Sequence, residues 1–78
     1  MTIHYLKTIP PYFQHVVDGN KNFEYRKNDR NFQVGDILHL AEWEAGFYTG
    51  RRITVRVIYI LRDFVPSSYV IMGTEVTE

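Results

Sequence analysis

The segment from Arg51 to Leu61 constrains the fold of this chain more than any other stretch. One half of its alternation is apolar throughout: Ile53, Val55, Val57, Tyr59 and Leu61. A period of two places these side chains on one face of a β-strand. The residues between them begin polar, at Thr54 and Arg56, and become apolar at Ile58 and Ile60. The pattern therefore predicts a long strand whose second half is covered on both faces.

Shorter patterns on both sides of this segment predict four more strands and one helix. The strands are expected at residues 3–6, 22–27, 37–43 and 69–76, where apolar or alternating residues are bounded by turn-forming ones. Thr8 is expected to cap a two-turn helix, with a proline in its first turn and Gly19 or Asn20 closing it in a left-handed conformation. One face of that helix is expected to be formed by Tyr12, Phe13, Val16 and Val17. Turns or loops are expected at residues 28–31, 34–36, 44–50 and 63–68.

These elements predict a single mainly β, α+β domain over residues 1–78. A chain of this size buries only about 60% of its unfolded surface, so its core is small. A small β-barrel with the helix beside it would remove exposed sheet edges. An open α+β sheet with a packed helix is the alternative.

The composition excludes several classes of function. The chain has no cysteine, so a disulfide framework, a thiolate metal site and a cysteine nucleophile are ruled out. Its histidines, His4, His15 and His39, lack the spacing of paired metal ligands, and there is no G-x-x-x-x-G-K-[ST] loop. We therefore expect no metal, no cofactor and no nucleoside triphosphate hydrolysis. The N-terminus lacks the apolar core of a signal peptide, and we expect a soluble cytoplasmic protein without a membrane partner.

Charged residues are concentrated between Gly19 and Arg30. The formal net charge is zero, which argues against a protein that coats nucleic acid nonspecifically. Residues 21–30 nevertheless hold four bases and two acids. Alternation in this segment places Phe23 and Tyr25 on one face and Glu24 on the other. The pattern fits a binding patch, and it fits equally well a half-exposed strand with surface ion pairs worth under about 1 kcal/mol each.

The run G-N-K-N-F-E-Y-R resembles the G-x-K-x-x-E-x-R signature of the ASCH domain, a PUA-like β-barrel. Further segments resemble one small bacterial and phage branch of it, a domain of unknown function (DUF3850): H-Y-L-K-T, R-K-N-D-R, F-Q-V-G-D-I-L, Y-T-G-R and Y-V-I-M. The resemblance covers nearly the whole chain in the expected order. It implies a barrel of five or six strands, a cleft beside the first helix and a role in binding RNA, which is an analogy at the level of the superfamily.

RNA binding is the first functional hypothesis. The resemblance implies that Lys21, Glu24 and Arg26 form the floor of the cleft, with Lys7 and Tyr69 as neighbours. Phosphates would meet Lys21, Arg26, Lys27 and Arg30, although Lys27 and Arg30 also fit ordinary surface charge. Tyr25 or Tyr48 would stack a base. Phe23 and Tyr25 are expected to fasten the strand to the barrel, so at most one of these two stacks a base. Glu24 would accept hydrogen bonds from a base or hold Lys21 or Arg26 in place. The expected partner is single-stranded or looped RNA, whose bases are open to stacking, or a nucleotide-like small molecule.

An enzyme is the alternative. One ASCH branch hydrolyses an acetylated cytidine with a lysine in the glycine-led motif, and Lys21 matches that lysine. A desolvated lysine near another cation can act as a base or nucleophile, with Glu24 and Glu75 as the acids. The pair Phe23-Glu24 stands where small hydroxyl residues are expected, which weakens this amidohydrolase reading.

A protein-interaction module that uses the exposed aromatics Phe47 and Tyr48 is the third hypothesis. Trp43 lies between Glu42 and Glu44, and we expect it to pack against the hairpin. Repulsion from the two carboxylates is expected to oppose nucleic acid there.

Overall fold

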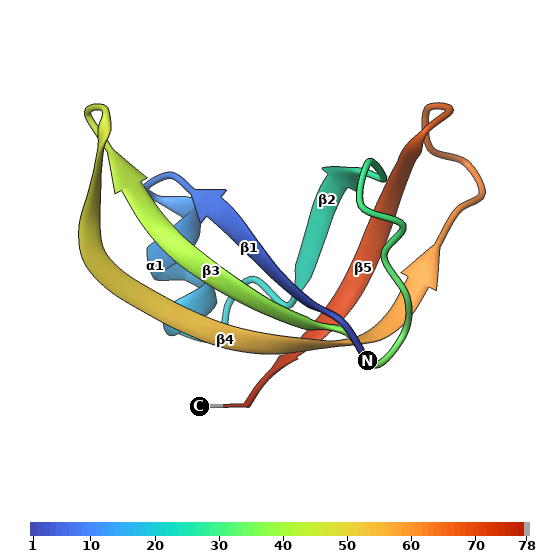
Figure 1. Cartoon of the computed structure of the whole chain (residues 1–78), viewed down its shortest axis with the longest axis horizontal. Coiled ribbons are helices and arrows are strands. Elements are labelled where there is room, and N and C mark those ends of the chain that lie inside the picture. Colours follow the sequence, from blue (N-terminus) through green and yellow to red (C-terminus); the bar gives the residue numbers. More distant parts are fainter. Residues whose placement is uncertain (78) are drawn as a thin grey trace.

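Five strands form one strongly curled sheet in the order β1–β3–β4–β5–β2 (Figure 1). The computed structural model describes residues 1–77. Along the chain the elements are β1 (Ile3–Thr8), α1 (Tyr12–Val17), β2 (Phe23–Lys27), β3 (Ile37–Glu44), β4 (Phe47–Leu61) and β5 (Tyr69–Val76). β1 pairs with β3 in parallel, and the other neighbours are antiparallel. The predicted mainly β class with one short helix is confirmed, and the sheet is a curled half-barrel.

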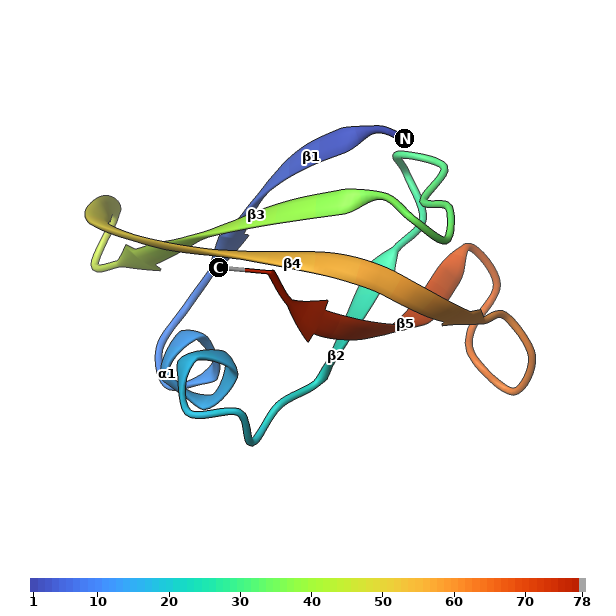
Figure 2. The ribbon, with the colours of Figure 1, turned by 90° about the horizontal axis from the view of Figure 1, so that it is seen from below.

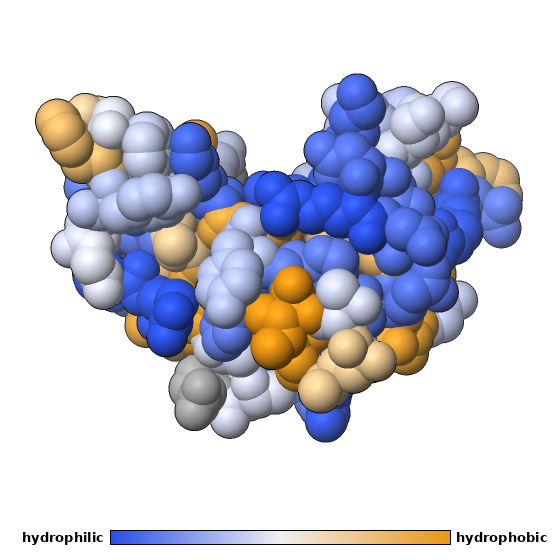
Figure 3. Space-filling model, in the orientation of Figure 1, coloured by the Kyte–Doolittle hydropathy of each residue, from blue (hydrophilic) through white to orange (hydrophobic). Residues whose placement is uncertain are grey.

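The two edges of the half-barrel, β1 and β2, are joined by side chains. The Thr2 carbonyl accepts from Ile37 N–H on β3, so odd-numbered residues of β1 direct their backbone groups to the open edge. There Arg26 Nη2 donates to the Lys7 carbonyl at 3.0 Å, and Arg30 Nη1 donates to the Tyr5 carbonyl at 2.9 Å. Hydrophilic side chains reach across the notch between the two arms of the molecule (Figure 3). These guanidinium groups satisfy carbonyls that a further strand would otherwise bind.

The core lies on the concave face of the sheet and is completed by α1. Its buried members are Leu6, Val16, Phe32, Leu38, Leu40, Val55, Val57, Val70 and Met72. α1 lies on one side of the sheet, and residues 18–22 lead from it to β2 (Figure 2). No helix among residues 1–77 is long and apolar enough to cross a membrane.

Two details of the predicted helix are wrong. Its N-cap is Pro11, because Thr8 is the last residue of β1 and pairs with β3. Phe13 and Val16 are buried, whereas Tyr12 and Val17 are half-exposed, because six residues present only a narrow face to the core. The closing residue is as expected: Gly19 has a φ of 81° and donates its N–H to the Val16 carbonyl.

A β-bulge in β4 explains why its second half is apolar on both faces. Val57 pairs with Thr74 and Tyr59 with Gly73, so Ile58 is an additional residue that reverses the alternation. Ile60 then packs against the core, and Tyr59 is 65% exposed. The expectation that this half is covered on both faces is wrong. Before the bulge the odd-numbered residues face the core, and after it the even-numbered residue Ile60 does, so both sets are apolar.

The β3–β4 hairpin is tighter than expected. Glu44 pairs with Phe47, which leaves only Ala45 and Gly46 in the loop, with φ values of 54° and 88°. Two consecutive positive φ angles are the signature of a type I′ turn, which matches the twist of the flanking strands. β4 therefore begins at Phe47, and the expected connection over residues 44–50 is mostly strand. Gly50, with a φ of 94°, marks a second irregularity in the pairing.

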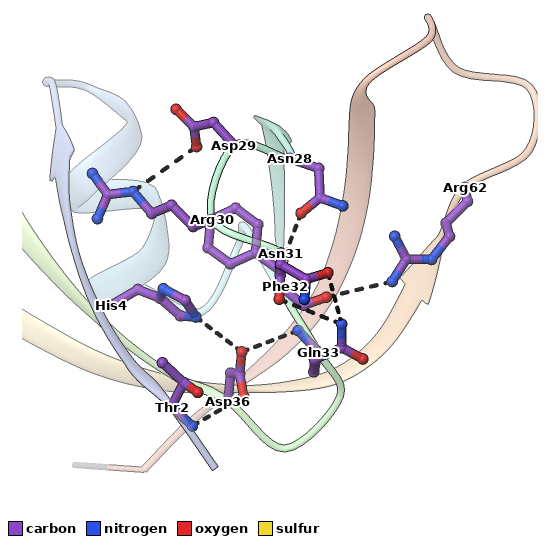
Figure 4. Close-up of polar contacts among 10 residues, drawn as sticks. All are labelled: Thr2, His4, Asn28, Asp29, Arg30, Asn31, Phe32, Gln33, Asp36 and Arg62. Atoms are coloured by element: carbon purple, nitrogen blue, oxygen red, sulfur yellow. Dashed lines mark hydrogen bonds and ion pairs between the residues drawn. The ribbon is translucent and has the colours of Figure 1, made fainter.

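The β2–β3 connection, residues 28–36, is held by a buried polar cluster (Figure 4). The Asp36 carboxylate accepts from His4 Nε2 at 2.9 Å, from Gln33 N–H at 3.0 Å and from Thr2 N–H at 3.1 Å. The Phe32 ring packs edge-on against His4. Burial acts to raise the pKa of Asp36, but the hydrogen bonds from His4, Gln33 and Thr2 and the charge of His4 lower it overall.

We expect Ala45→Asn to stabilise the protein. A left-handed conformation costs an alanine roughly 1–2 kcal/mol, and asparagine tolerates it better and favours this turn. Chemical denaturation should show a gain of about 0.5–1 kcal/mol in the free energy of unfolding. Gly46→Ala is the matched change in the opposite direction and should destabilise. An Ala45→Asn variant with unchanged or lower stability would contradict the turn assignment.

Asp36→Asn should lower the free energy of unfolding by about 1–3 kcal/mol at neutral pH, because a buried hydrogen-bonded carboxylate is lost. The folded-state pKa of Asp36 is depressed, so its contribution is present above the unfolded pKa and disappears as the pH falls below about 4. The difference between wild type and variant should therefore shrink in acid. Asp29→Asn, at an exposed carboxylate, is the control. An equal difference at pH 7 and pH 2 would contradict this account.

Candidate ligand groove between α1 and β2

A groove of about 560 Å³ lies between the start of α1, the end of β1 and the free edge of β2. Its walls are mainly apolar and aromatic, formed by Ile9, Tyr12, Phe23 and Tyr25. Lys21, Glu24 and Arg26 supply its charged groups. The remaining lining residues are Lys7, Thr8, His15 and Asn20. A cleft of this size with apolar walls and a few convergent polar groups is typical of a small-ligand site.

The charged groups of the groove are organised around the Glu24 carboxylate, which is only 2% exposed. Lys21 Nζ donates to Oε2 at 2.5 Å, and Arg26 Nε donates to Oε1 at 3.0 Å. Lys21 Nζ also donates to the Phe23 carbonyl at 2.7 Å. A buried carboxylate is tolerated when cations and hydrogen bonds compensate for the lost water. The cluster has two cations and one anion, so it carries a net positive charge.

Local structure explains why these three side chains meet. Alternation along β2 turns Glu24 and Arg26 to the concave side of the sheet. Lys21 comes from the turn after α1, where the N–H groups of Asn20 and Lys21 both donate to the His15 carbonyl. The left-handed conformation of Gly19 lets the chain make that turn. Gly19, Lys21, Glu24 and Arg26 thus each have a defined part in building the groove.

Arg26 links the groove to the closure of the half-barrel. Besides Glu24, its Nη2 contacts the Lys7 carbonyl and, at 3.2 Å, the Thr8 hydroxyl. The expected role of Arg26 was contact with phosphate, and most of its donors are engaged by the protein itself. Its side chain is 26% exposed, so it still presents part of its charge to the groove.

The other predicted site residues are divided between the groove and the surface around it. Lys7 and Tyr25 line the groove. Lys27 is exposed at the end of β2, and Arg30 bridges to β1 beside Asp29. Glu75, the second acid of the enzyme hypothesis, forms an exposed ion pair with Arg56 and is not among the residues that line the groove.

The aromatic residues of β2 are more exposed than expected. Phe23 and Tyr25 are 47% and 49% exposed, because the alternation that buries Glu24 turns them to the opposite side. They do not fasten β2 to the core and instead line the groove. The Tyr25 ring lies 5.4 Å from that of Tyr69.

The sequence did not indicate Thr8, Ile9, Tyr12, Asn20 or Phe23 as lining residues. A usable signal existed for Tyr12, because Tyr12 and His15 are three residues apart and share a helix face. Their rings are in edge-to-face contact at 6.4 Å. Thr8 and Ile9 carried no such signal, since they reach the groove only because β1 lies at the sheet edge.

The family model described as "Domain of unknown function (DUF3850)" matches residues 3–74, which include every residue of the groove. This chain belongs to the DUF3850 family. It is also similar to the "Uncharacterized 12.9 kDa protein in GpA 3'region" of Escherichia phage P2, with 46% identity over 55 residues. That match covers 70% of this chain and 50% of the phage protein, so this DUF3850 chain spans about half the length of that relative.

Glu24→Gln should destabilise this DUF3850 chain by about 2 kcal/mol. The amide keeps the shape of the side chain but leaves Lys21 and Arg26 without a compensating negative charge. Urea denaturation measures the effect, and Glu44→Gln, at an exposed carboxylate at the end of β3, is the matched control. Glu44→Gln should change stability by less than about 0.5 kcal/mol. Equal effects of the two substitutions would contradict the central place of Glu24.

Proposed function

We propose that this DUF3850 chain binds an unpaired RNA base, or a nucleotide-like ligand, in the groove between α1 and β2. The observation that supports it is the combination of aromatic walls with the buried cluster of Lys21, Glu24 and Arg26. A base has two flat faces that stack on aromatic side chains and a polar edge that forms hydrogen bonds. The groove offers both kinds of contact in one place.

The aromatic walls supply the affinity in this proposal. Tyr12 on α1, and Phe23 and Tyr25 on β2, are all about half-exposed. Stacking of a base on an aromatic side chain is worth roughly 1–3 kcal/mol. These residues line the groove from two different elements, so a planar ligand can be held on more than one side.

The charged cluster supplies orientation. Both carboxylate oxygens of Glu24 already accept hydrogen bonds, so its first role is to hold Lys21 and Arg26 in place. A carboxylate has about four acceptor positions, which leaves capacity for a base amino group. The net positive charge of the cluster favours an anionic ligand such as a nucleotide.

We further propose that the half-barrel is a PUA-like ASCH fold. The support is that the conspicuous positions of G-x-K-x-x-E-x-R act together: Gly19 turns the chain, and Lys21, Glu24 and Arg26 form the charged part of the groove. A signature whose members converge on one cavity is better explained by a shared site than by chance.

The nucleoside amidohydrolase alternative has less support. Lys21 lies in the groove, but its ammonium group donates to Glu24 and to the Phe23 carbonyl, and Glu75 does not line the groove. Incubation with N4-acetylcytidine tests it directly. Release of cytidine that depends on Lys21 would favour the enzyme over the binding module.

Phe23→Ala and Tyr12→Ala should each weaken the binding of a labelled single-stranded RNA of about ten nucleotides. Loss of one stacking contact predicts a reduction in affinity of about tenfold, measured by fluorescence anisotropy. Both side chains are half-exposed, so neither change should disturb folding, which circular dichroism can check.

Phe64→Ala is the matched control for these variants. Phe64 is fully exposed in the β4–β5 loop and is not among the groove-lining residues. Wild-type affinity in both Phe23→Ala and Tyr12→Ala, or no RNA binding by the wild-type chain, would overturn the proposal.

A further inference from the structure

The outer face of β1, β3 and β4 carries aromatic and basic side chains, and most of them do not line the groove. The strand register aligns Lys7, Ala41 and Arg52 in one row across the three strands. The neighbouring row contains Tyr5 and His39, whose rings stack at 5.0 Å. Rows of this kind are about 6.6 Å apart, because residues i and i+2 share a face of a strand.

A second pair of aromatic rings lies towards the hairpin. Trp43 and Tyr48 are paired across β3 and β4, with ring centroids 4.7 Å apart. The Lys7 ammonium lies 4.0 Å from the centroid of the Trp43 ring, in a cation–π contact. The outer face thus presents cations and aromatic rings side by side.

A shallow hollow of about 450 Å³ opens on this part of the sheet. It exists because the pairing is irregular: Ala41 pairs with Arg52 and Trp43 with Tyr48, so β4 has two additional residues at this point. Ala41 and Gly50 are small, and they leave space between Tyr48 and Arg52. We call this space the β4 hollow.

Arg52 is the available cation of the β4 hollow. Its neighbour Arg51 is engaged by Gln14 at 2.8 Å and by Glu42 at 3.6 Å. Among residues 1–77, no hydrogen bond or ion pair involves the Arg52 guanidinium. An exposed guanidinium beside an aromatic ring suits a phosphate next to a base.

The expected repulsion from Glu42 and Glu44 is weaker than the sequence suggested. Glu42 is buried on the concave side, where it accepts from the Thr49 hydroxyl at 2.7 Å and pairs with Arg51. Only Glu44 adds an exposed carboxylate near Trp43. The expectation that two carboxylates face this surface is therefore wrong for Glu42.

Lys7 connects the two surfaces. It lines the groove, and its ammonium group lies over Trp43 on the outer face. β1 is an edge strand, so an extended ligand that leaves the groove can pass over this edge without crossing the core. The groove and the outer face can therefore contact one extended ligand.

We propose that single-stranded RNA held in the groove continues over β1 at Lys7 onto the outer face, where Arg52 binds a phosphate in the β4 hollow and Tyr48 contacts a base. This inference rests on the proposed RNA-binding function of the groove. A duplex fits the surface less well, because paired bases do not offer their faces to aromatic side chains.

The chain contains its own reporter for this path, because Trp43 is its only tryptophan and lies on the outer face. The probes are cytidine monophosphate, which is too short to reach the outer face from the groove, and a single-stranded RNA of about ten nucleotides, which can reach both surfaces at once. The longer RNA should change Trp43 fluorescence, whereas the mononucleotide should leave it unchanged.

Arg52→Ala should lower the affinity for the longer RNA several-fold. It should also make the slope of log affinity against log salt concentration shallower by about 0.7, the value for one phosphate contact with a single strand. Its affinity for the mononucleotide should stay at the wild-type value. Arg62→Ala is the control, because Arg62 is an exposed arginine just beyond the end of β4 with one weak contact to the Phe32 carbonyl.

The outcomes separate the two proposals. Suppose that Phe23→Ala lowers the affinity for RNA but Arg52→Ala binds RNA with wild-type affinity and salt dependence. RNA binding in the groove is then supported, and the path over the outer face is wrong. If a polyglutamate peptide changes Trp43 fluorescence as strongly as RNA does, the hollow is an anion site for acidic protein segments, and the RNA path is overturned. Absence of all RNA binding overturns both.

Discussion

The arrangement of the two sheet edges and of the groove depends on the contacts of the Arg26 guanidinium. The half-barrel leaves the outer edges of β1 and β2 without a strand partner. Arg26 connects these two edges by binding Glu24 on one side and the Lys7 carbonyl and Thr8 hydroxyl on the other. Arg30 repeats the connection at Tyr5. A planar group with five donors can hold several acceptors at once, which a lysine ammonium cannot do with the same geometry. The same contacts that close the fold therefore shape the charged part of the groove.

Three buried acids in the described part of the chain lie at points where the regular sheet ends or is interrupted. Glu24 lies at the open edge, Glu42 at the irregularity between β3 and β4, and Asp36 at the end of the β2–β3 connection. Each is compensated by its own donors, from Lys21 and Arg26, from Thr49 and Arg51, and from His4, respectively. A small core cannot fill these irregular points with apolar groups alone. Buried polar groups whose hydrogen bonds are all made hold a single conformation there instead.

The sequence predicted well whatever depends on local periodicity. The alternation of β3 and β4 and the glycine after α1 were readable because side-chain direction follows directly from backbone period. Three other features could not be predicted from the sequence, because they depend on which strand pairs with which. They are the bulge at Ile58, the turn at Ala45-Gly46 and the exposure of Phe23. In the candidate site, Lys21, Glu24 and Arg26 were recognised from their motif, whereas Thr8 and Ile9 reach the groove only through the non-local placement of β1 at the sheet edge.

The strand order has a consequence for how the chain acquires its shape. β1 and β2 are neighbours in sequence but occupy opposite edges of the sheet, and β2 pairs with β5, where Phe23 meets Gly73. Contacts between residues so distant in the chain stabilise the fold only after long loops have closed, and closing those loops costs entropy. The β3–β4 hairpin is local and can form early, whereas the groove needs both edges in place. We therefore expect the groove to form late in folding, after the last strand has joined the sheet.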